Sequence, residues 1–263
     1  MPAPSLSELE AALREAWCRW TADPADHYRW TPDCPASGQC GSTALIVHDA
    51  FGGELMMAEV RGADGGDRGV HYFNRLPDGS ELDLTREQFR EAEQLVDVVT
   101  VPTPADRTRG RLPGQYHLLA ARVARELAAP GSAGGERPVS IKAVCTDRGG
   151  RVLLARNHRG EWELPGGRPE PGELFADALR RELSEETGLG VEVGPLLGVG
   201  ELQAAPGRWV DVVAFACDPT VSAEAVAGLA VSEEHLEVGF VEIAALGAEE
   251  LAPLYRELIM RAR

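Results

Sequence analysis

The sequence is poor in cysteine and has no long hydrophobic run, and each shortage excludes a class of protein. Five cysteines in 263 residues form a sparse, odd-numbered set, so a disulfide framework is not expected and the thiols should be reduced. No apolar segment approaches the roughly 20 residues that a membrane-spanning helix needs. The N-terminus, MPAPSLSELE, lacks the basic start and apolar core of a signal peptide. We therefore expect a cytoplasmic protein without a membrane segment.

The chain also has few basic residues. The chain has 26 lysines and arginines against 42 aspartates and glutamates, a formal net charge of -16. This balance argues against a nucleic-acid backbone or an anionic membrane as the primary partner. The length suits one large domain or two smaller ones, and each half could bury its own core.

The most informative stretch is residues 167–189, GRPEPGELFADALRRELSEETGL. With about 100° per residue, Glu182, Glu185 and Glu186 fall on one face of a helix, where like charges repel one another. Hard divalent cations such as Mg²⁺ or Mn²⁺ prefer carboxylate oxygens and bind substrate phosphates. The acidic face therefore predicts a metal site for a diphosphate, and Arg181, one turn before Glu185, can hold that carboxylate by a charge-assisted hydrogen bond.

The other face of this helix is apolar. Phe175, Leu179 and Leu183 form an i, i+4, i+8 stripe that can be buried. A solvated acidic helix is the alternative interpretation. The spacing argues against it, because the pattern G-x5-E-x7-R-E-U-x-E-E-x-G-U, with U aliphatic, is present without a mismatch. The segment closely resembles the Nudix box of the Nudix hydrolases.

This resemblance implies Mg²⁺- or Mn²⁺-dependent hydrolysis of a nucleoside diphosphate linked to another moiety, such as ADP-ribose, a nucleotide sugar or an intact or oxidised nucleoside triphosphate. It also implies roles for particular residues. The metal-binding groups would be Glu182, Glu185, Glu186 and the carbonyl of Gly167. Arg181 matches the orienting arginine and Glu173 a supporting acid. The general base would come from the box carboxylates or from a later loop, where the candidates are Glu233 and Glu234.

Substrate selection lies outside the box. Pro206 follows the box at about the distance of a proline found in ADP-ribose hydrolysing members. Four residues could stack on or contact the base of a nucleotide, and each could equally be a packing or surface residue: Trp162, Trp209, Arg156 and His158. A nucleotide-sensing module without turnover is the alternative from another functional class. It would be expected to have lost box carboxylates, and all are present.

Composition and periodicity predict two domains. Residues 128–137 are small and rich in glycine and proline, which indicates a linker. Before it, residues 1–127 should form a smaller α+β domain. After it, residues 138–263 alternate strands with two helices, one in the box and one over 248–260, which suits a mixed sheet between helical layers. An α/β/α sandwich of this kind is what the Nudix resemblance implies.

The first domain contains a second constellation. A capped helix is predicted from Ser5 to about Trp20, and Cys40 lies at or just before the start of another helix closed by Gly52 and Gly53. A hairpin of residues 69–74 and 81–84 would place His71 nearly opposite Asp83. A cysteine at a helix start, with histidine and aspartate on paired strands, is the layout of papain-like and transglutaminase-like thiol enzymes.

Two other interpretations of these residues stay open. Cys40, His71 and Asp83 could be ordinary core and turn residues, or Cys34 and Cys40 could bind zinc with His27 or His48. The segment from Trp30 to Phe89 resembles the YunG-like bacterial family, which indicates a domain and hardly a function. The chain would then be a Nudix hydrolase whose first domain contributes substrate contacts, dimerisation or regulation, or a bifunctional protein with a Cys40-dependent thiol hydrolase or transferase.

Overall fold

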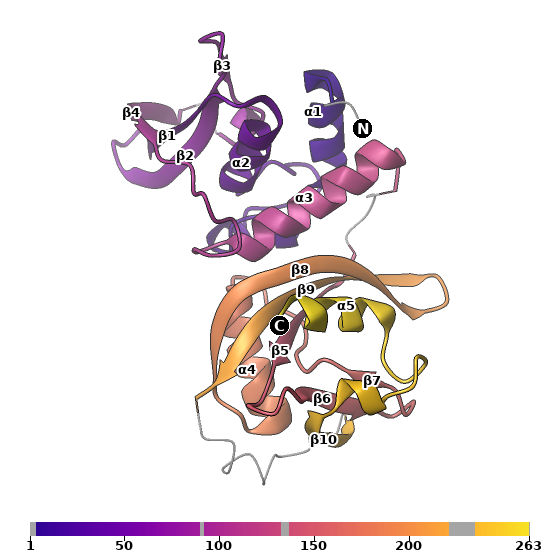
Figure 1. Cartoon of the computed structure of the whole chain (residues 1–263). Coiled ribbons are helices and arrows are strands. Elements are labelled where there is room, and N and C mark those ends of the chain that lie inside the picture. The colour runs from indigo at the N-terminus through magenta and orange to yellow at the C-terminus, as the bar shows by residue number, and fades with distance from the viewer. Residues whose placement is uncertain (1–3, 90–91, 133–136, 221–234, 263) are drawn as a thin grey trace. The chain divides into compact units, whose positions relative to one another are not determined.

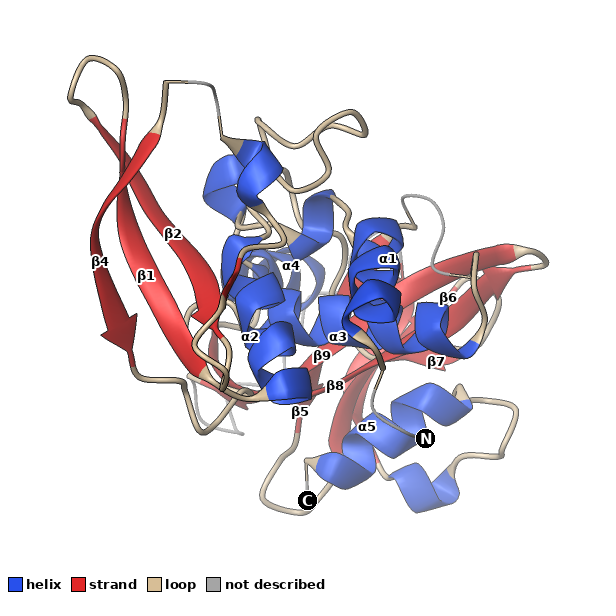
Figure 2. Ribbon diagram, turned by 90° about the horizontal axis from the view of Figure 1, so that it is seen from above, coloured by secondary structure: helices blue, strands red, loops and turns tan. Residues whose placement is uncertain are grey.

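A computed structural model describes residues 4–89, 92–132, 137–220 and 235–262. The chain divides into two compact units, one of residues 1–107 and 115–136 and the other of residues 108–114 and 137–263. Both units combine helices with strands (Figures 1 and 2), which confirms the mixed α and β composition expected from the sequence. None of the helices that these residues form has both the length and the apolar character required to cross a membrane.

The described residues of the N-terminal unit form three α-helices and one sheet. Its elements are α1 (Leu6–Ala16), the short 3-10 turns η1 (Arg19–Thr21) and η2 (Pro24–Asp26), α2 (Cys40–Phe51), β1 (Glu54–Arg61), β2 (Asp67–Arg75), β3 (Glu81–Leu82), η3 (Arg86–Gln88), β4 (Gln94–Val101) and α3 (Pro113–Ala128). The strands lie in the order β3-β2-β1-β4, and every neighbouring pair is antiparallel. Helix α2 packs on β2 and β1, as Figure 2 shows.

Helix α1 begins as the sequence predicts and ends earlier. Ser5 and Glu8 form the expected capping box. The helix stops at Ala16 because Trp17 adopts an extended backbone, and the chain then turns into η1. The indole N–H of Trp17 donates to the Thr43 hydroxyl at 3.1 Å, and the buried Arg122 donates from Nε to the carbonyl of Ala16 at 2.8 Å. Hydrogen bonds from residues distant in the sequence thus hold the end of helix α1 in place.

In the part of the C-terminal unit that the structure describes, the strands form two three-stranded sheets. Its elements are β5 (Val139–Cys145), β6 (Val152–Asn157), β7 (Trp162–Glu163), α4 (Phe175–Thr187), β8 (Val191–Ala205), β9 (Arg208–Pro219), β10 (His235–Val241), η5 (Ile243–Ala245) and α5 (Pro253–Arg261). One sheet has the order β5-β9-β8, with β5 parallel and β8 antiparallel to β9. The other, β10-β6-β7, is antiparallel.

The single mixed sheet expected from the sequence is therefore divided in two. Strands β5 and β6 follow each other in the chain, and the isolated bridge between Thr146 and Val152 joins their ends. Beyond that bridge β5 pairs with β9, and β6 pairs with β10 and β7. The core lies between the sheets and α5, where Val144, Leu154 and Leu258 are buried together.

The last helix starts later than the sequence predicts. Residues 248–252 were expected to be helical, but α5 begins at Pro253. The carbonyl of Glu250 accepts a hydrogen bond from the backbone N–H of Trp162 at 2.8 Å, and Leu251 forms a bridge with the same residue. These residues thus run beside β7, and Pro253 occupies the first helical turn, where a missing N–H does no harm.

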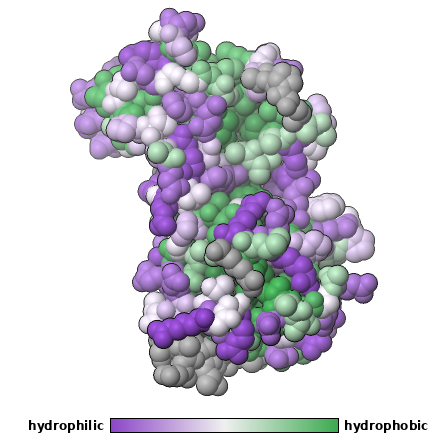
Figure 3. Space-filling model, in the orientation of Figure 1, coloured by the Kyte–Doolittle hydropathy of each residue, from purple (hydrophilic) through white to green (hydrophobic). Residues whose placement is uncertain are grey.

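The surface reflects the composition. On the face shown in Figure 3, hydrophilic residues cover much of each unit, and smaller hydrophobic areas lie between them. A few large apolar side chains in the N-terminal unit are exposed: Tyr28, Val70, Val98 and Val99. Such scattered exposure is ordinary for a folded protein and carries no functional implication by itself.

Candidate functional site

Helix α4 presents the predicted acidic face because its other face is anchored in the core. Phe175, Leu179 and Leu183 are buried, as the stripe predicts. The helix packs on β5 and β8. It ends at Gly188, whose φ of 71° is the left-handed conformation that glycine adopts without strain. These contacts fix the rotation of α4, and thereby the direction of its carboxylates.

Arg181 organises the outer part of this face. Its guanidinium donates from Nε and Nη2 to the two carboxylate oxygens of Glu173, at 3.0 and 2.9 Å. Nη1 donates to Glu182 at 2.9 Å and to Glu185 at 3.3 Å, and Nη2 also reaches the carbonyl of Arg168 at 3.1 Å. The hydrogen bonds to Glu173, together with those to Glu182, raise the pKa of Arg181. Burial raises the pKa of Glu173, but the hydrogen bonding and charge of Arg181, together with the hydrogen bond from the backbone N–H of Glu170, outweigh it and lower that pKa.

The three box carboxylates differ in environment. The side chain of Glu185 is 61% exposed, whereas those of Glu182 and Glu186 are 17% and 9% exposed. Glu182 and Glu185 meet at Arg181, and Glu186 turns inward, where it accepts a hydrogen bond from the backbone N–H of Gly166 at 2.8 Å. Burial raises the pKa of Glu186. The structure therefore joins Glu182 to Glu185 and directs Glu186 toward the loop before the helix.

Two residues beside the box carboxylates were not identified from the sequence. Lys142, on β5, is buried, and its ammonium donates to the carbonyl of Gly166 at 2.6 Å. Burial lowers the pKa of Lys142, but Tyr255 and the carboxylates of Glu163, Glu186 and Glu182 outweigh it and raise that pKa. A lysine within the apolar segment SIKAVC was a usable signal, because a lysine is rarely buried without a partner.

The second missed residue is His235, at the start of β10. Its Nε2 lies 3.3 Å from Glu163 Oε1 and 3.9 Å from Glu186 Oε1. The hydrogen bond to Glu163 raises the pKa of His235. Burial raises the pKa of Glu163, but His235 and Lys142 outweigh it and lower that pKa. The neighbouring candidates for the general base, Glu233 and Glu234, lie outside the described residues.

The donor set suits a hard divalent cation. Glu182 and Glu186 supply carboxylate oxygens one helical turn apart, and a Cβ placed on Gly167 would lie 2.4 Å from the Glu182 carboxyl group. The carbonyl of Gly167 accepts from the backbone N–H of Ile141 at 2.8 Å, and a carbonyl oxygen has a second lone pair. Within the described residues, no three acidic, histidine or cysteine side chains already converge on one metal position.

Gly166 offers a test of how tightly the loop is built. Its φ is 120°, and an added Cβ would lie 2.3 Å from the carbonyl oxygen of Ile141. We expect Gly166→Ala to lower the free energy of unfolding by about 3 kcal/mol or more, measured by urea denaturation, because backbone strain and steric overlap add. Gly150→Ala is the control, because Gly150 also has a positive φ and an added Cβ there meets nothing within 4 Å. Equal losses in the two variants would contradict the close approach.

The aromatic residues considered for base stacking are separated by the fold. Trp162 is buried in the core between the sheets, with the guanidinium carbon of Arg156 5.7 Å from its ring centroid. Trp209, on β9, is 44% exposed. Of the two tryptophans, Trp209 is therefore the one whose ring is open to solvent, and Trp162 serves packing.

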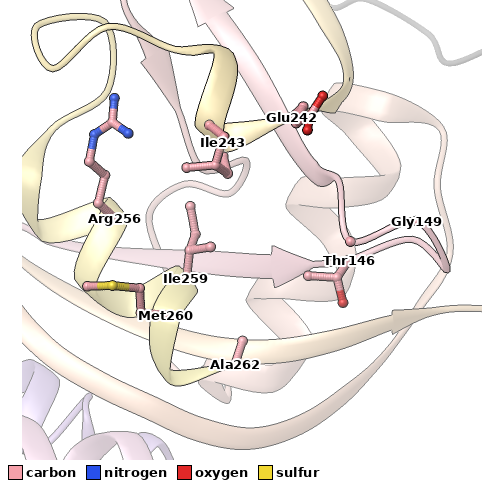
Figure 4. Close-up of a pocket in the computed structure, with 10 residues that line it drawn as sticks. Thr146, Gly149, Glu242, Ile243, Arg256, Ile259, Met260 and Ala262 are labelled. Carbon is pink, nitrogen blue, oxygen red and sulfur yellow. The ribbon is translucent and has the colours of Figure 1, made fainter.

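A pocket of about 800 Å³ opens elsewhere in the C-terminal unit, beside the turn at residues 146–150 (Figure 4). In that view Ile243 and Ile259 lie close together at its apolar part. Arg256 donates to the carbonyls of Leu246 and Gly247. No described residue of α4 lines this pocket, so it is separate from the acidic face of α4.

The N-terminal unit brings Cys40, His71 and Asp83 together. Cys40 is the first residue of α2 and is partly exposed. The His71 imidazole, 1% exposed on β2, hydrogen-bonds through Nε2 to Asp83 Oδ2 at 2.9 Å, and the Cys40 thiol lies close enough to raise the pKa of that imidazole. The juxtaposition that the hairpin predicts is present.

Other groups hold the imidazole and the carboxylate in place. Asp83 Oδ1 accepts from the backbone N–H of Thr85 at 3.1 Å and from its hydroxyl at 3.3 Å. The Gln88 amide lies 3.2 Å from His71 Nδ1, and its carbonyl accepts from the backbone N–H of Gly38 at 3.3 Å. The Phe89 ring packs on the imidazole with its centroid 4.6 Å away. The orientation of His71 is thus set from several sides.

The zinc site considered from the sequence is not formed. The Cys34 thiol hydrogen-bonds to the Ser37 hydroxyl at 3.1 Å, and the His27 ring packs against Trp20 with centroids 5.5 Å apart. These residues are described in the structure, and neither they nor Cys40 and His48 belong to a group that could hold a metal.

The protonation of His71 should make stability depend on pH. Burial lowers the pKa of His71, but its hydrogen bond to Asp83 and its interaction with Cys40 together outweigh burial and raise that pKa from 6.5 to about 9. Because the folded state then binds this proton more tightly than the unfolded chain, the stabilisation is complete below about pH 6.5 and is lost as the pH rises through about 9. With about 1.4 kcal/mol per pKa unit, we expect the free energy of unfolding to fall by about 3 kcal/mol across this range.

Urea denaturation at several pH values measures this effect. Asp83→Asn is the comparison, since it keeps the shape of the side chain and removes the charge that favours the imidazolium. Its pH dependence should be distinctly shallower. Identical curves for the two proteins would show that the His71–Asp83 pair does not govern the change.

Comparison with known proteins finds a family model for each half of the chain. Residues 136–262 match the sequence model of the NUDIX domain, and residues 5–128 match that of the YunG protein. The uncharacterised protein YunG of Bacillus subtilis is 33% identical over 85 residues, which are 32% of this chain and 64% of that protein. The 8-oxo-dGDP phosphatase NUDT18 of Homo sapiens is 43% identical over 84 residues, 30% of this chain and 25% of that protein.

A solved structure of a MutT protein from Methanosarcina mazei Go1 is 29% identical, with 49% of this chain and 96% of that chain covered and a TM-score of 0.40. This chain spans less than two thirds of the length of the two curated relatives. The C-terminal unit carries a NUDIX domain, and this confirms the resemblance read from the box. The N-terminal unit carries a YunG domain, again as the sequence predicts.

Proposed function

We propose that the C-terminal unit is a metal-dependent Nudix hydrolase that cleaves the pyrophosphate bond of a nucleoside diphosphate linked to another moiety. One observation carries this proposal: the guanidinium of Arg181 donates hydrogen bonds to Glu173, which lies just before α4, and to Glu182 and Glu185 on that helix. Glu186 accepts a hydrogen bond from the backbone N–H of Gly166. All these carboxylates lie in the part of the chain that matches the NUDIX domain. Such an array suits the binding of a divalent cation and a diphosphate.

The residues that would hold the cation are Glu182, Glu185 and Glu186, with the carbonyl of Gly167. When bound, a divalent cation supplies charge neutralisation on the phosphate oxygens and lowers the pKa of coordinated water. The positive charge of Lys142 offsets part of the negative charge of Glu182 and Glu186. It thereby reduces the repulsion between these carboxylates before a cation binds.

We assign the proton transfer to Glu185. It is the most exposed of the three box carboxylates, and its one hydrogen bond to Arg181 is the longest that this guanidinium makes to a carboxylate, at 3.3 Å. It can therefore accept the proton of an attacking water. That water adds across the P–O–P linkage, so that one phosphate gains a hydroxyl group and the other leaves with its bridging oxygen. Glu233 and Glu234 stay alternatives for this role.

The candidate substrates are compounds that contain a nucleoside diphosphate. One relative is named for 8-oxo-dGDP, and another, from Escherichia coli, is a CTP pyrophosphohydrolase. We propose to test these compounds with ADP-ribose, nucleotide sugars and nucleoside triphosphates, each with Mg²⁺ and with Mn²⁺. Release of a nucleoside monophosphate or of pyrophosphate, abolished by a chelator, is the expected result. Tight binding without turnover over the whole panel would favour a nucleotide-sensing module.

A further inference from the structure

The N-terminal unit contains a cluster that nucleotide hydrolysis does not use. Cys40 at the start of α2, His71 on β2 and Asp83 after β3 come from three elements and meet at one place. The thiol is partly open to solvent, whereas the imidazole behind it is buried. A nucleophile at the surface, backed by an enclosed base and its orienting acid, is the arrangement that covalent catalysis requires.

We propose that Cys40, His71 and Asp83 form a second active site, in which the Cys40 thiol attacks the carbonyl carbon of an acyl compound, an amide or an ester. His71 would move the proton, and Asp83 would hold the imidazole in the orientation that this transfer needs. The proposal does not depend on nucleotide hydrolysis by the C-terminal unit.

The surroundings of the other cysteines differ from those of Cys40. Cys34 bonds to a serine hydroxyl. Cys145 and Cys217 are buried opposite each other on paired strands, and Cys18 is buried where burial raises the pKa of its thiol. A cysteine that only filled space would need no buried histidine beside it, since burying an imidazole is costly unless it is paired, as His71 is with Asp83. The pairing of Cys40 with His71 therefore favours chemistry over packing.

The helix start supplies a place for the developing negative charge. Cys40 is the first residue of a helix of 12 residues, and the first N–H groups of a helix have no partner within it. The neighbouring Gly41 has no side chain, and a Cβ placed there would meet only Tyr72, at 3.8 Å. A carbonyl oxygen of an acyl group on Sγ can thus approach backbone N–H groups that stabilise an oxyanion.

The reaction balances without another reagent except water. His71 takes up the thiol proton before the attack and holds it while the bond from Sγ to the carbonyl carbon forms. His71 then gives that proton to the leaving amine or alcohol as the acyl bond breaks, and a thioester remains on Cys40. Water attacks the thioester while His71 accepts its proton, and the thiol is restored as a carboxylic acid departs.

Acylation by p-nitrophenyl acetate tests the proposal on the full-length protein. We expect a burst of nitrophenol and an acetyl group on Cys40, located by mass spectrometry of the peptides. Cys40→Ser should carry no acetyl group at this position, and His71→Asn should slow the burst on the order of 100-fold, as loss of a general base does. Absence of acetyl transfer to Cys40 in the wild-type protein would overturn the proposal.

A second measurement needs no variant and so cannot be confounded by misfolding. Alkylation by iodoacetamide is followed at each cysteine in the wild-type protein, and Cys34, also partly exposed and in the same unit, is the internal reference. Cys40 should react on the order of tenfold or more faster than Cys34. Equal rates would overturn the proposal. Nucleotide hydrolysis by Cys40→Ser should be unchanged, which keeps this test separate from the one for the C-terminal unit.

Discussion

Replacing Glu186 by glutamine is expected to reduce kcat/KM for nucleotide hydrolysis on the order of 100-fold or more, because the variant loses a carboxylate that would hold the cation. The amide oxygen of glutamine can still accept the hydrogen bond that Gly166 donates to Glu186. The fold should therefore persist, and the loss should be one of catalysis.

The measurement is steady-state hydrolysis of the best substrate at several Mg²⁺ concentrations. Glu192→Gln is the matched control, because Glu192 is an exposed residue of β8. It should keep the wild-type rate. A fully active Glu186→Gln protein would remove the basis of the proposed function, whatever the behaviour of the control.

Removing the guanidinium of Arg181 should have the second large effect. In Arg181→Ala, Glu173, Glu182 and Glu185 lose their common donor. The carboxylates then repel one another and move from their positions, and a displacement of about 1 Å can lower a rate about 100-fold. Unfolding should also become easier by about 1–3 kcal/mol, less than for a fully buried pair because these side chains are partly exposed.

Arg180→Ala provides the matched control at the adjacent position. Arg180 pairs with Asp177 on the exposed surface, and such a pair contributes about 0–1 kcal/mol. The rate should stay close to that of the wild-type protein. If the two variants lost activity equally, the assignment of Arg181 as the organiser of the acidic face would be wrong. Arg181→Lys, which keeps the charge without the planar fork, should recover little activity.

The features that the sequence predicts well depend on neighbours a few residues apart. The capping box of Ser5 and Glu8 and the buried stripe of Phe175, Leu179 and Leu183 follow from spacing along one helix. The closeness of His71 to Asp83 follows from one short turn between two strands. In each case the geometry of a single local element determines which side chains meet.

The features that were missed depend on pairing between distant segments. Lys142 is buried because β5 lies parallel to β9, some 70 residues further along the chain, with Lys142 opposite Ala214. His235 reaches Glu163 across 72 residues of sequence. The helix expected from Ala248 begins at Pro253 because the segment before it bonds to Trp162. Local periodicity contains no information about these partners.

The sequence alone specified the two domain types, the acidic helix with its arginine, and the candidate nucleophile with its histidine and aspartate. These properties are encoded in residue types at fixed short spacings, where helix and hairpin geometry leave few alternatives. The division of the C-terminal strands into two sheets, the buried Lys142 and His235 beside the carboxylates, and the enclosure of His71 behind a partly open thiol emerged from the folded structure. They depend on which distant strands pair and which side chains water can reach, and the whole chain settles both through the burial of its apolar surface.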